Sequence, residues 1–143
     1  MRRRVAELMT RAVEQIVPEM SVREAATLMR ERNIGCFPVC DRGRVVGIIT
    51  DRDIAIRVLA VGRNPDATRV DEAMTRDVVC CGEDDLLSEA SDLMSRWQIR
   101  RVPVVSGRGE LVGLLTLGKL AAIDASVSGD VLKQVVQPAE RQS

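Results

Sequence analysis

The sequence predicts a mixed α/β protein in which one small structural unit occurs twice. Two observations lead to this fold class. Blocks of residues recur at a nearly constant offset along the 143-residue chain, so its two halves share one pattern. Each half also combines helical spacing of apolar residues with short runs rich in β-branched residues, which are typical of strands. Two copies are too few for a solenoid, and we therefore expect two half-domains packed about a pseudo-twofold axis.

The internal repeat is visible in several ordered matches. Val5–Thr10 returns as Val70–Thr75, and Pro38-Val39 returns as Pro103-Val104. After a one-residue insertion near Arg108, the later blocks also match, namely Val46-Gly47 with Val112-Gly113 and Thr50 with Thr116. The repeat predicts a first domain at residues 1–61, a linker at 62–69, a second domain at 70–126 and a tail at 127–143.

The elements of the first copy follow from capping and turn residues. Ser21–Glu24 is a capping box that opens a helix, and Asn33 and Gly35 end it. The residues that follow predict, in order, a strand at Phe37–Cys40, a hairpin turn at Asp41–Arg44, a strand at Val45–Thr50 and a helix at Asp51–Ala60.

The second copy repeats this order. Its predicted elements are a helix at Leu87–Arg96, a strand at Val102–Val105, a turn at Ser106–Gly109, a strand at Leu111–Thr116 and a helix at Leu117–Ala125. The polar tail after Gly129 forms either a short helix at Asp130–Val136 or a frayed end.

Composition limits the classes of function. Lys plus Arg and Asp plus Glu are both 21, so no overall field attracts nucleic acid or an anionic membrane. Phe37 and Trp97 are the only aromatic residues, which argues against base stacking along a single strand. No apolar run is long enough for a membrane span and no signal peptide is recognisable, so we expect a cytoplasmic protein without nucleic-acid or membrane partners.

Metal binding and catalysis are not expected. The four cysteines form no C-x-x-C motif and the chain has no histidine, which favours buried, reduced thiols over a zinc site. The sequence also has no P-loop, no nucleophile elbow and no G-x-G-x-x-G motif. An enzyme is therefore the least favoured class of function.

The duplicated motifs resemble those of the cystathionine-β-synthase (CBS) domain family. An apolar-Pro pair lies on the first strand of each copy, and a Gly-apolar-apolar-Thr segment closes the second strand. These residues are Phe37-Pro38 and Gly47–Asp53 in the first copy, and Val102-Pro103 and Gly113–Lys119 in the second. The resemblance implies a stand-alone tandem pair of CBS-type β-α-β-β-α half-domains, also called a Bateman module.

The same resemblance implies a function. It points to a regulatory module that binds an adenosyl ligand in a cleft between the two copies, forms a homodimer and signals to a regulated protein. Candidate ligands are AMP, ADP, ATP, NAD and S-adenosylmethionine, and no cofactor is required. The alternative is a dimeric scaffold that binds no nucleotide and acts through protein contacts alone.

Thr50 and Asp53 are the candidate ribose-binding residues. A carboxylate accepts hydrogen bonds from both ribose hydroxyls, and each such charge-assisted bond contributes roughly 1.5–3 kcal/mol. Thr50-x-x-Asp53 is equally a capping box for the helix that starts there, and both roles can hold together. Gly47, which allows close backbone approach, favours ligand binding in addition.

The remaining candidate residues come from both copies. The resemblance implies that the base lies against Ile48, Val78, Val79 and Pro103. Arg100, Arg101 and Lys119 form a basic group suited to phosphates, although the two arginines are equally consistent with a solvated strand entry. Because lysine has no acceptor and Lys119 stands where the first copy has Asp53, we expect the second cleft to hold no ribose.

Overall fold

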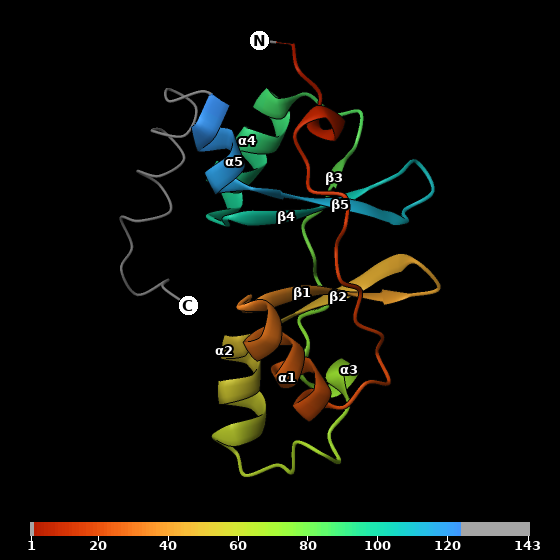
Figure 1. Cartoon of the computed structure of the whole chain (residues 1–143), viewed down its shortest axis with the longest axis vertical. Coiled ribbons are helices and arrows are strands. Elements are labelled where there is room, and N and C mark those ends of the chain that lie inside the picture. The colour runs from red at the N-terminus through yellow and green to blue at the C-terminus, as the bar shows by residue number, and fades with distance from the viewer. Residues whose placement is uncertain (1, 124–143) are drawn as a thin grey trace. The chain divides into compact units, whose positions relative to one another are not determined.

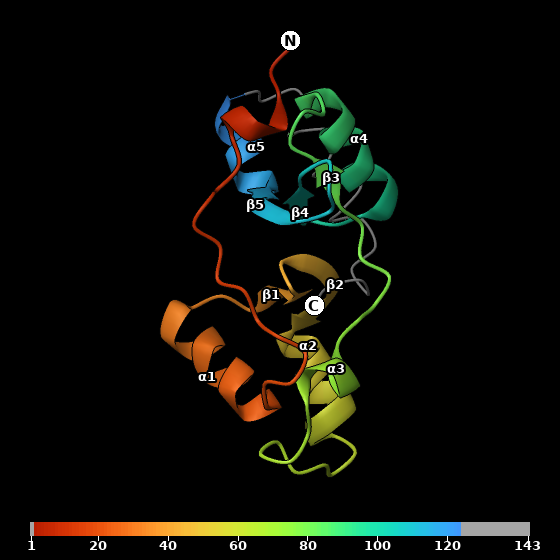
Figure 2. The same cartoon turned by 90° about the vertical axis from the view of Figure 1, so that its right-hand side faces the viewer.

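The structure, a computed structural model, describes residues 2–123 and divides into two compact units. Within the described residues, unit 1 combines residues 2–13 with residues 79–123, and unit 2 is Glu14–Val78. Figures 1 and 2 show the helices and strands of each unit. The mixed α/β class expected from the sequence is confirmed, because each unit packs helices against a small sheet.

Unit 2 is a hairpin with helices packed beside it. Its elements are α1 (Val22–Arg32), β1 (Cys36–Asp41), β2 (Arg44–Thr50), α2 (Asp51–Ile54) and α3 (Val70–Ala73), and a π-helical turn at Ala55–Leu59 continues α2. Strands β1 and β2 pair antiparallel, with Cys36 opposite Thr50. The buried core of this unit includes Ile16, Phe37 and Ile49.

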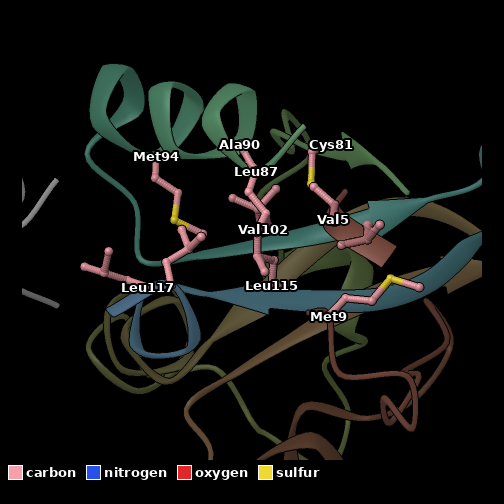
Figure 3. Close-up of a cluster of buried hydrophobic side chains, with 11 residues drawn as sticks. Val5, Met9, Cys81, Leu87, Ala90, Met94, Val102, Leu115 and Leu117 are labelled. Atoms are coloured by element: carbon pink, nitrogen blue, oxygen red, sulfur yellow. The ribbon is translucent and has the colours of Figure 1, made fainter. Parts of the chain in front are cut away.

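Unit 1 has the same plan with one further strand. Its elements are a 3₁₀ turn at Val5–Glu7, β3 (Cys81–Gly82), α4 (Leu87–Trp97), β4 (Arg101–Val105), β5 (Leu111–Thr116) and α5 (Leu117–Ile123). Strand β4 pairs parallel with β3 and antiparallel with β5. Figure 3 shows Ala90 and Leu87 of α4 pointing towards Val102 and Leu115 of the sheet, and Met94 pointing towards Leu117 of α5.

Local chemistry explains where the two long helices begin and end. The Ser21 hydroxyl accepts a hydrogen bond from the Glu24 backbone N–H at 3.1 Å, which confirms the predicted capping box of α1. Helix α1 ends at Asn33 in the left-handed conformation, with φ of 55°, and α4 ends at the matching residue Gln98 with φ of 54°. The repeat therefore extends to a backbone conformation that non-glycine residues rarely adopt.

The strand that opens each repeat differs in length between the copies. In the second copy β3 pairs Cys81 with Val104 in parallel orientation. In the first copy the matching residues, Ile16 and Val39, form a single parallel bridge outside any named strand. The expected β-α-β-β-α order is thus complete in the second copy. In the first copy its opening strand is reduced to one bridge.

The opening segment of each repeat packs with the other repeat. Thr10, from the first copy, pairs with Leu114 in unit 1, whereas Thr75, from the second copy, pairs with Ile48 in unit 2. Residues 62–69, expected as a linker, also belong to unit 2, where Thr68 is buried. The compact units therefore have different boundaries from the sequence repeats at 1–61 and 70–126.

One expected helix has a different form, and two other predictions fall on residues that the structure does not describe. The helix expected at Asp51–Ala60 is α-helical only to Ile54, after which the backbone makes one π-helical turn. The end of the helix expected to reach Ala125, and the tail at 127–143 with its possible helix at Asp130–Val136, lie outside the described residues. Within residues 2–123 no helix has the length and apolar character needed to cross a bilayer.

Gly47 and Gly113 leave room for the opening segment of the other repeat to pack against each hairpin. A Cβ atom on Gly47 would lie 2.5 Å from Met74 Sδ and 2.9 Å from the Thr75 carbonyl oxygen. A Cβ atom on Gly113 would lie 2.6 Å from Met9 Sδ and 2.9 Å from the Thr10 carbonyl oxygen. The close backbone approach that we expected Gly47 to give a ligand is instead used by the chain itself.

This packing generates a stability prediction. Gly47→Ala is expected to destabilise the protein by about 1–3 kcal/mol, because the added methyl overlaps a backbone oxygen that cannot move freely. Urea unfolding measures the change. Gly107→Ala is the matched control, because nothing lies within 4 Å of a Cβ atom at that glycine. Equal stability of the two variants would contradict the packing role of Gly47.

Candidate functional site

Thr50 and Asp53 form a complete capping box at the start of α2. The Asp53 N–H donates to Thr50 Oγ1 at 3.0 Å, and the Thr50 N–H donates to Asp53 Oδ2 at 3.0 Å. The capping role considered from the sequence is therefore present. It fixes the position of the carboxylate at the end of β2, next to the Thr50 hydroxyl.

The second carboxylate oxygen of Asp53 faces residues that sequence reasoning did not single out. Thr75 Oγ1 donates to Asp53 Oδ1 at 3.4 Å, and Arg57 Nε lies 4.0 Å from the same oxygen. The Asp53 side chain is 12 % exposed. A carboxylate has about four acceptor positions, so these contacts leave acceptor capacity for a ligand hydroxyl.

Arg57 connects this carboxylate to the segment after α3. Its Nη1 donates to the carbonyl oxygens of Ala73 at 3.2 Å and Met74 at 2.9 Å. The π-helical turn contains Arg57, one helical step after Asp53. The recurrence of a Met-Thr pair in both copies was the one sequence feature that could have drawn attention to Thr75.

Ile48 and Val78 belong to the same unit as Asp53. Ile48 exchanges two backbone hydrogen bonds with Thr75, each 2.9 Å long, and its side chain is half-buried. Val78 lies three residues after Thr75 and is also half-buried. Unit 2 therefore brings the ribose-binding candidates together with Ile48, while Val78 lies at the end of the unit.

The basic residues gather at one end of the hairpin in unit 1. Arg101 lies opposite Thr116 in the β4–β5 register, and the Leu117 N–H donates to the Arg100 carbonyl oxygen at 2.8 Å. The Lys119 N–H donates to Thr116 Oγ1 at 3.2 Å, which is one of the two hydrogen bonds of a capping box. Among residues 2–123, none of these three cations forms an ion pair.

The matching end of the hairpin in unit 2 has the opposite charge. Gly35 and Cys36 stand in place of the two arginines, and Asp53 stands in place of Lys119. A Cβ atom on Gly35 would lie 2.5 Å from Asp51 Oδ2, so a larger residue there would disturb that carboxylate. The two copies thus share a backbone but offer different chemistry, acceptors in unit 2 and cations in unit 1.

The candidate residues are divided between the units. Thr50, Asp53, Ile48 and Val78 lie in unit 2, whereas the other candidates lie in unit 1, namely Val79, Pro103, Arg100, Arg101 and Lys119. Pro103 is buried, Val79 is half-buried and both arginines are exposed. That one ligand contacts both sets stays a prediction.

A separate groove of about 370 Å³ lies within unit 2, between α1 and the helical turns that follow β2. Apolar residues of both helical segments line it, together with Arg23, Arg30 and Arg63. No candidate ligand-binding residue lines this groove. Leu59 at its edge is 76 % exposed, and Val61 nearby is 65 % exposed.

Comparison with known proteins assigns the family. The family model described as CBS domain matches residues 5–60 and again residues 70–125. This chain belongs to the CBS domain family. The resemblance seen in the duplicated motifs is therefore confirmed, as is the tandem organisation.

Three proteins of known sequence or structure are similar to this chain over most of its length. The CBS domain-containing protein YhcV of Bacillus subtilis is 42 % identical over 117 residues, covering 82 % of each chain. The CBS domain pair of protein MJ0100, solved with 5-methylthioadenosine and S-adenosyl-L-methionine, superimposes with a TM-score of 0.75 at 29 % identity, covering 88 % of this chain and 98 % of that one. CBSX2, solved with AMP, gives a TM-score of 0.73 at 26 % identity, covering 87 % and 97 %.

The cysteines do not form a metal centre within the described part of the chain, where no group of three or more Cys, Asp or Glu side chains is placed to hold an ion. Burial, with the nearby carboxylate of Asp85, raises the pKa of Cys81 to about 12. Burial also raises the pKa of Cys80. A raised pKa lowers the thiolate fraction at neutral pH, so both thiols are poor nucleophiles.

Thiol alkylation tests this environment. In the folded protein at pH 8, Cys81 is expected to remain unmodified by iodoacetamide, because almost no thiolate is present and the side chain is buried. In urea it should react like the other cysteines, which provides the internal control. Peptide mass spectrometry measures both states, and rapid modification of Cys81 in the folded protein would contradict the assigned environment.

Proposed function

We propose that this chain is a cytoplasmic regulatory module, not an enzyme, that binds an adenosyl nucleotide and passes its state to a partner protein. Thr50 and Asp53 hold the ribose in this proposal. The observation that supports this proposal most directly is the Asp53 carboxylate, which the capping box fixes and which retains free acceptor capacity. The adenosyl ligands bound by two similar CBS domain pairs support the choice of ligand class.

The other candidates complete the proposed site. The base contacts Ile48, Val78, Val79 and Pro103, which are all apolar. Phosphates contact Arg100, Arg101 and Lys119, whose charges are not neutralised by carboxylates within residues 2–123. AMP, ADP, ATP and NAD carry phosphates that suit these cations, whereas S-adenosylmethionine has no phosphate and offers them only its carboxylate.

One ligand per chain follows from the substitution of Lys119 for the carboxylate. Thr116 keeps its hydroxyl at the start of α5, but the ammonium of Lys119 cannot accept a ribose hydroxyl. The site built on unit 1 therefore lacks the group that defines the site built on unit 2. We expect a stoichiometry of one nucleotide per chain.

Titration calorimetry with AMP, ADP, ATP, NAD and S-adenosylmethionine tests the proposal. Asp53→Asn is expected to weaken nucleotide binding about tenfold or more, because the hydrogen bonds to a charged acceptor are lost while a capping oxygen remains. Asp41→Asn is the matched control, because Asp41 is exposed at the other end of the same hairpin.

The alternative function is a ligand-free scaffold. It predicts no heat and no thermal shift with any of the five compounds. It also predicts that Asp53→Asn changes only stability, through the capping box. Mass spectrometry of small molecules released from the purified, gently denatured protein distinguishes the two functions independently.

We propose in addition that the module is a homodimer whose contact surface includes the exposed apolar residues of unit 2. Ile56, Leu59 and Val61 are 48 %, 76 % and 65 % exposed, which is unusual for side chains of this size so close in sequence. Leu59 also lines the groove described above. A second copy presents the same apolar surface, and a twofold contact covers both at once.

Light scattering after size exclusion measures the oligomeric state. Leu59→Glu is expected to convert the dimer to a monomer, because the contact would have to bury a carboxylate without a partner. Val17→Glu is the control, since Val17 is 47 % exposed in the same unit but outside this surface. A dimer unaffected by Leu59→Glu would contradict the assigned surface.

A further inference from the structure

Besides its capping bond with Thr50, the Asp53 carboxylate contacts Thr75 and Arg57, which connect it to residues 73–75. Thr75 Oγ1 donates to Asp53 Oδ1 at 3.4 Å, and Arg57 lies between that oxygen and the carbonyl groups of Ala73 and Met74. The backbone of Thr75 is itself fixed by two hydrogen bonds to Ile48. The carboxylate and this segment are therefore one connected polar network within unit 2.

The matching network is missing from unit 1. Thr10 corresponds to Thr75 and pairs with Leu114 in the same way, each backbone bond being 2.9 Å long. The residues corresponding to Asp53 and Arg57 are Lys119 and Ile123, which cannot form this network. Packing common to both units thus explains the backbone hydrogen bonds of Thr10 and Thr75. The contact between a threonine hydroxyl and a carboxylate, from Thr75 to Asp53, is specific to unit 2.

Geometry gives the Thr75 hydroxyl a defined effect on Asp53. One carboxylate oxygen is held by the capping bond from Thr50, and the hydroxyl of Thr75 holds the other. Together they fix the rotation of the carboxylate about its Cβ–Cγ bond. Ribose binding to a carboxylate that is already held in this orientation costs less conformational entropy than binding to a carboxylate that becomes ordered only when the ligand binds.

We propose that Thr75 is a positioning residue for Asp53, and that binding of the nucleotide at Asp53 is transmitted through Thr75 and Arg57 to residues 73–78. This inference rests on the proposed function and adds its route of regulation. Residues 73–78 are the last of unit 2, after which the chain enters unit 1 at Val79. A ligand hydroxyl that shares Asp53 with Thr75 stiffens one of the two places where the chain passes from one unit to the other, the second being Val13–Glu14.

The test compares Thr75→Val with Thr10→Val in the full chain, using AMP as the probe. Thr75→Val is expected to weaken AMP binding about three- to tenfold, and Thr75→Ser to restore it, since the lost group is one hydroxyl donor. Thr10→Val is expected to leave the affinity unchanged. Should Thr75→Val fold poorly, Thr75→Ala is the second variant, and thermal unfolding of each variant separates positioning from stability.

Hydrogen exchange supplies a readout that a purely structural threonine would not change. In the wild type, AMP is expected to slow exchange of the Met74 and Thr75 amides, and Thr75→Val is expected to abolish that slowing even at saturating AMP. Equal behaviour of Thr75→Val and Thr10→Val would overturn this inference and leave the proposed function standing. Failure of the wild type to bind any adenosyl compound would instead overturn the proposed function.

Discussion

The paired backbone hydrogen bonds between Ile48 and Thr75, and between Thr10 and Leu114, are the constraint on which the rest of the structure depends. Each pair fixes the opening segment of one repeat against the second strand of the other repeat. Gly47 and Gly113 make this approach possible, since a methyl group at either would overlap the neighbouring backbone. The chain therefore builds each compact unit from both of its repeats.

This constraint also determines the surroundings of the candidate site. Because Thr75 is fixed beside Ile48, its hydroxyl reaches the Asp53 carboxylate at the end of the same hairpin. The capping box orients the carboxylate from one side, and Thr75 with Arg57 contacts it from the other. The Asp53 carboxylate, which the sequence pairs only with Thr50, is held by three segments of unit 2.

Duplication of the backbone did not preserve the chemistry. The two copies keep matching helix ends, matching β-bulges and matching glycines, because packing requires them. At the ends of the hairpins the residues differ, since Gly35, Cys36 and Asp53 of unit 2 correspond to Arg100, Arg101 and Lys119 of unit 1. This difference is the physical basis for proposing one nucleotide per chain, with phosphates on the basic residues.

The sequence by itself determined the elements whose causes are local. Ser21 and Glu24 cap α1 through side chains three residues apart, the Arg42-Gly43 turn closes the first hairpin, and Thr50 with Asp53 caps α2. Only the tertiary structure decided which strand each opening segment joins, and therefore the roles of Gly47, Thr75 and Arg57. Those roles arise from contacts between residues far apart in the chain, and neither hydrophobic spacing nor capping residues contain that information.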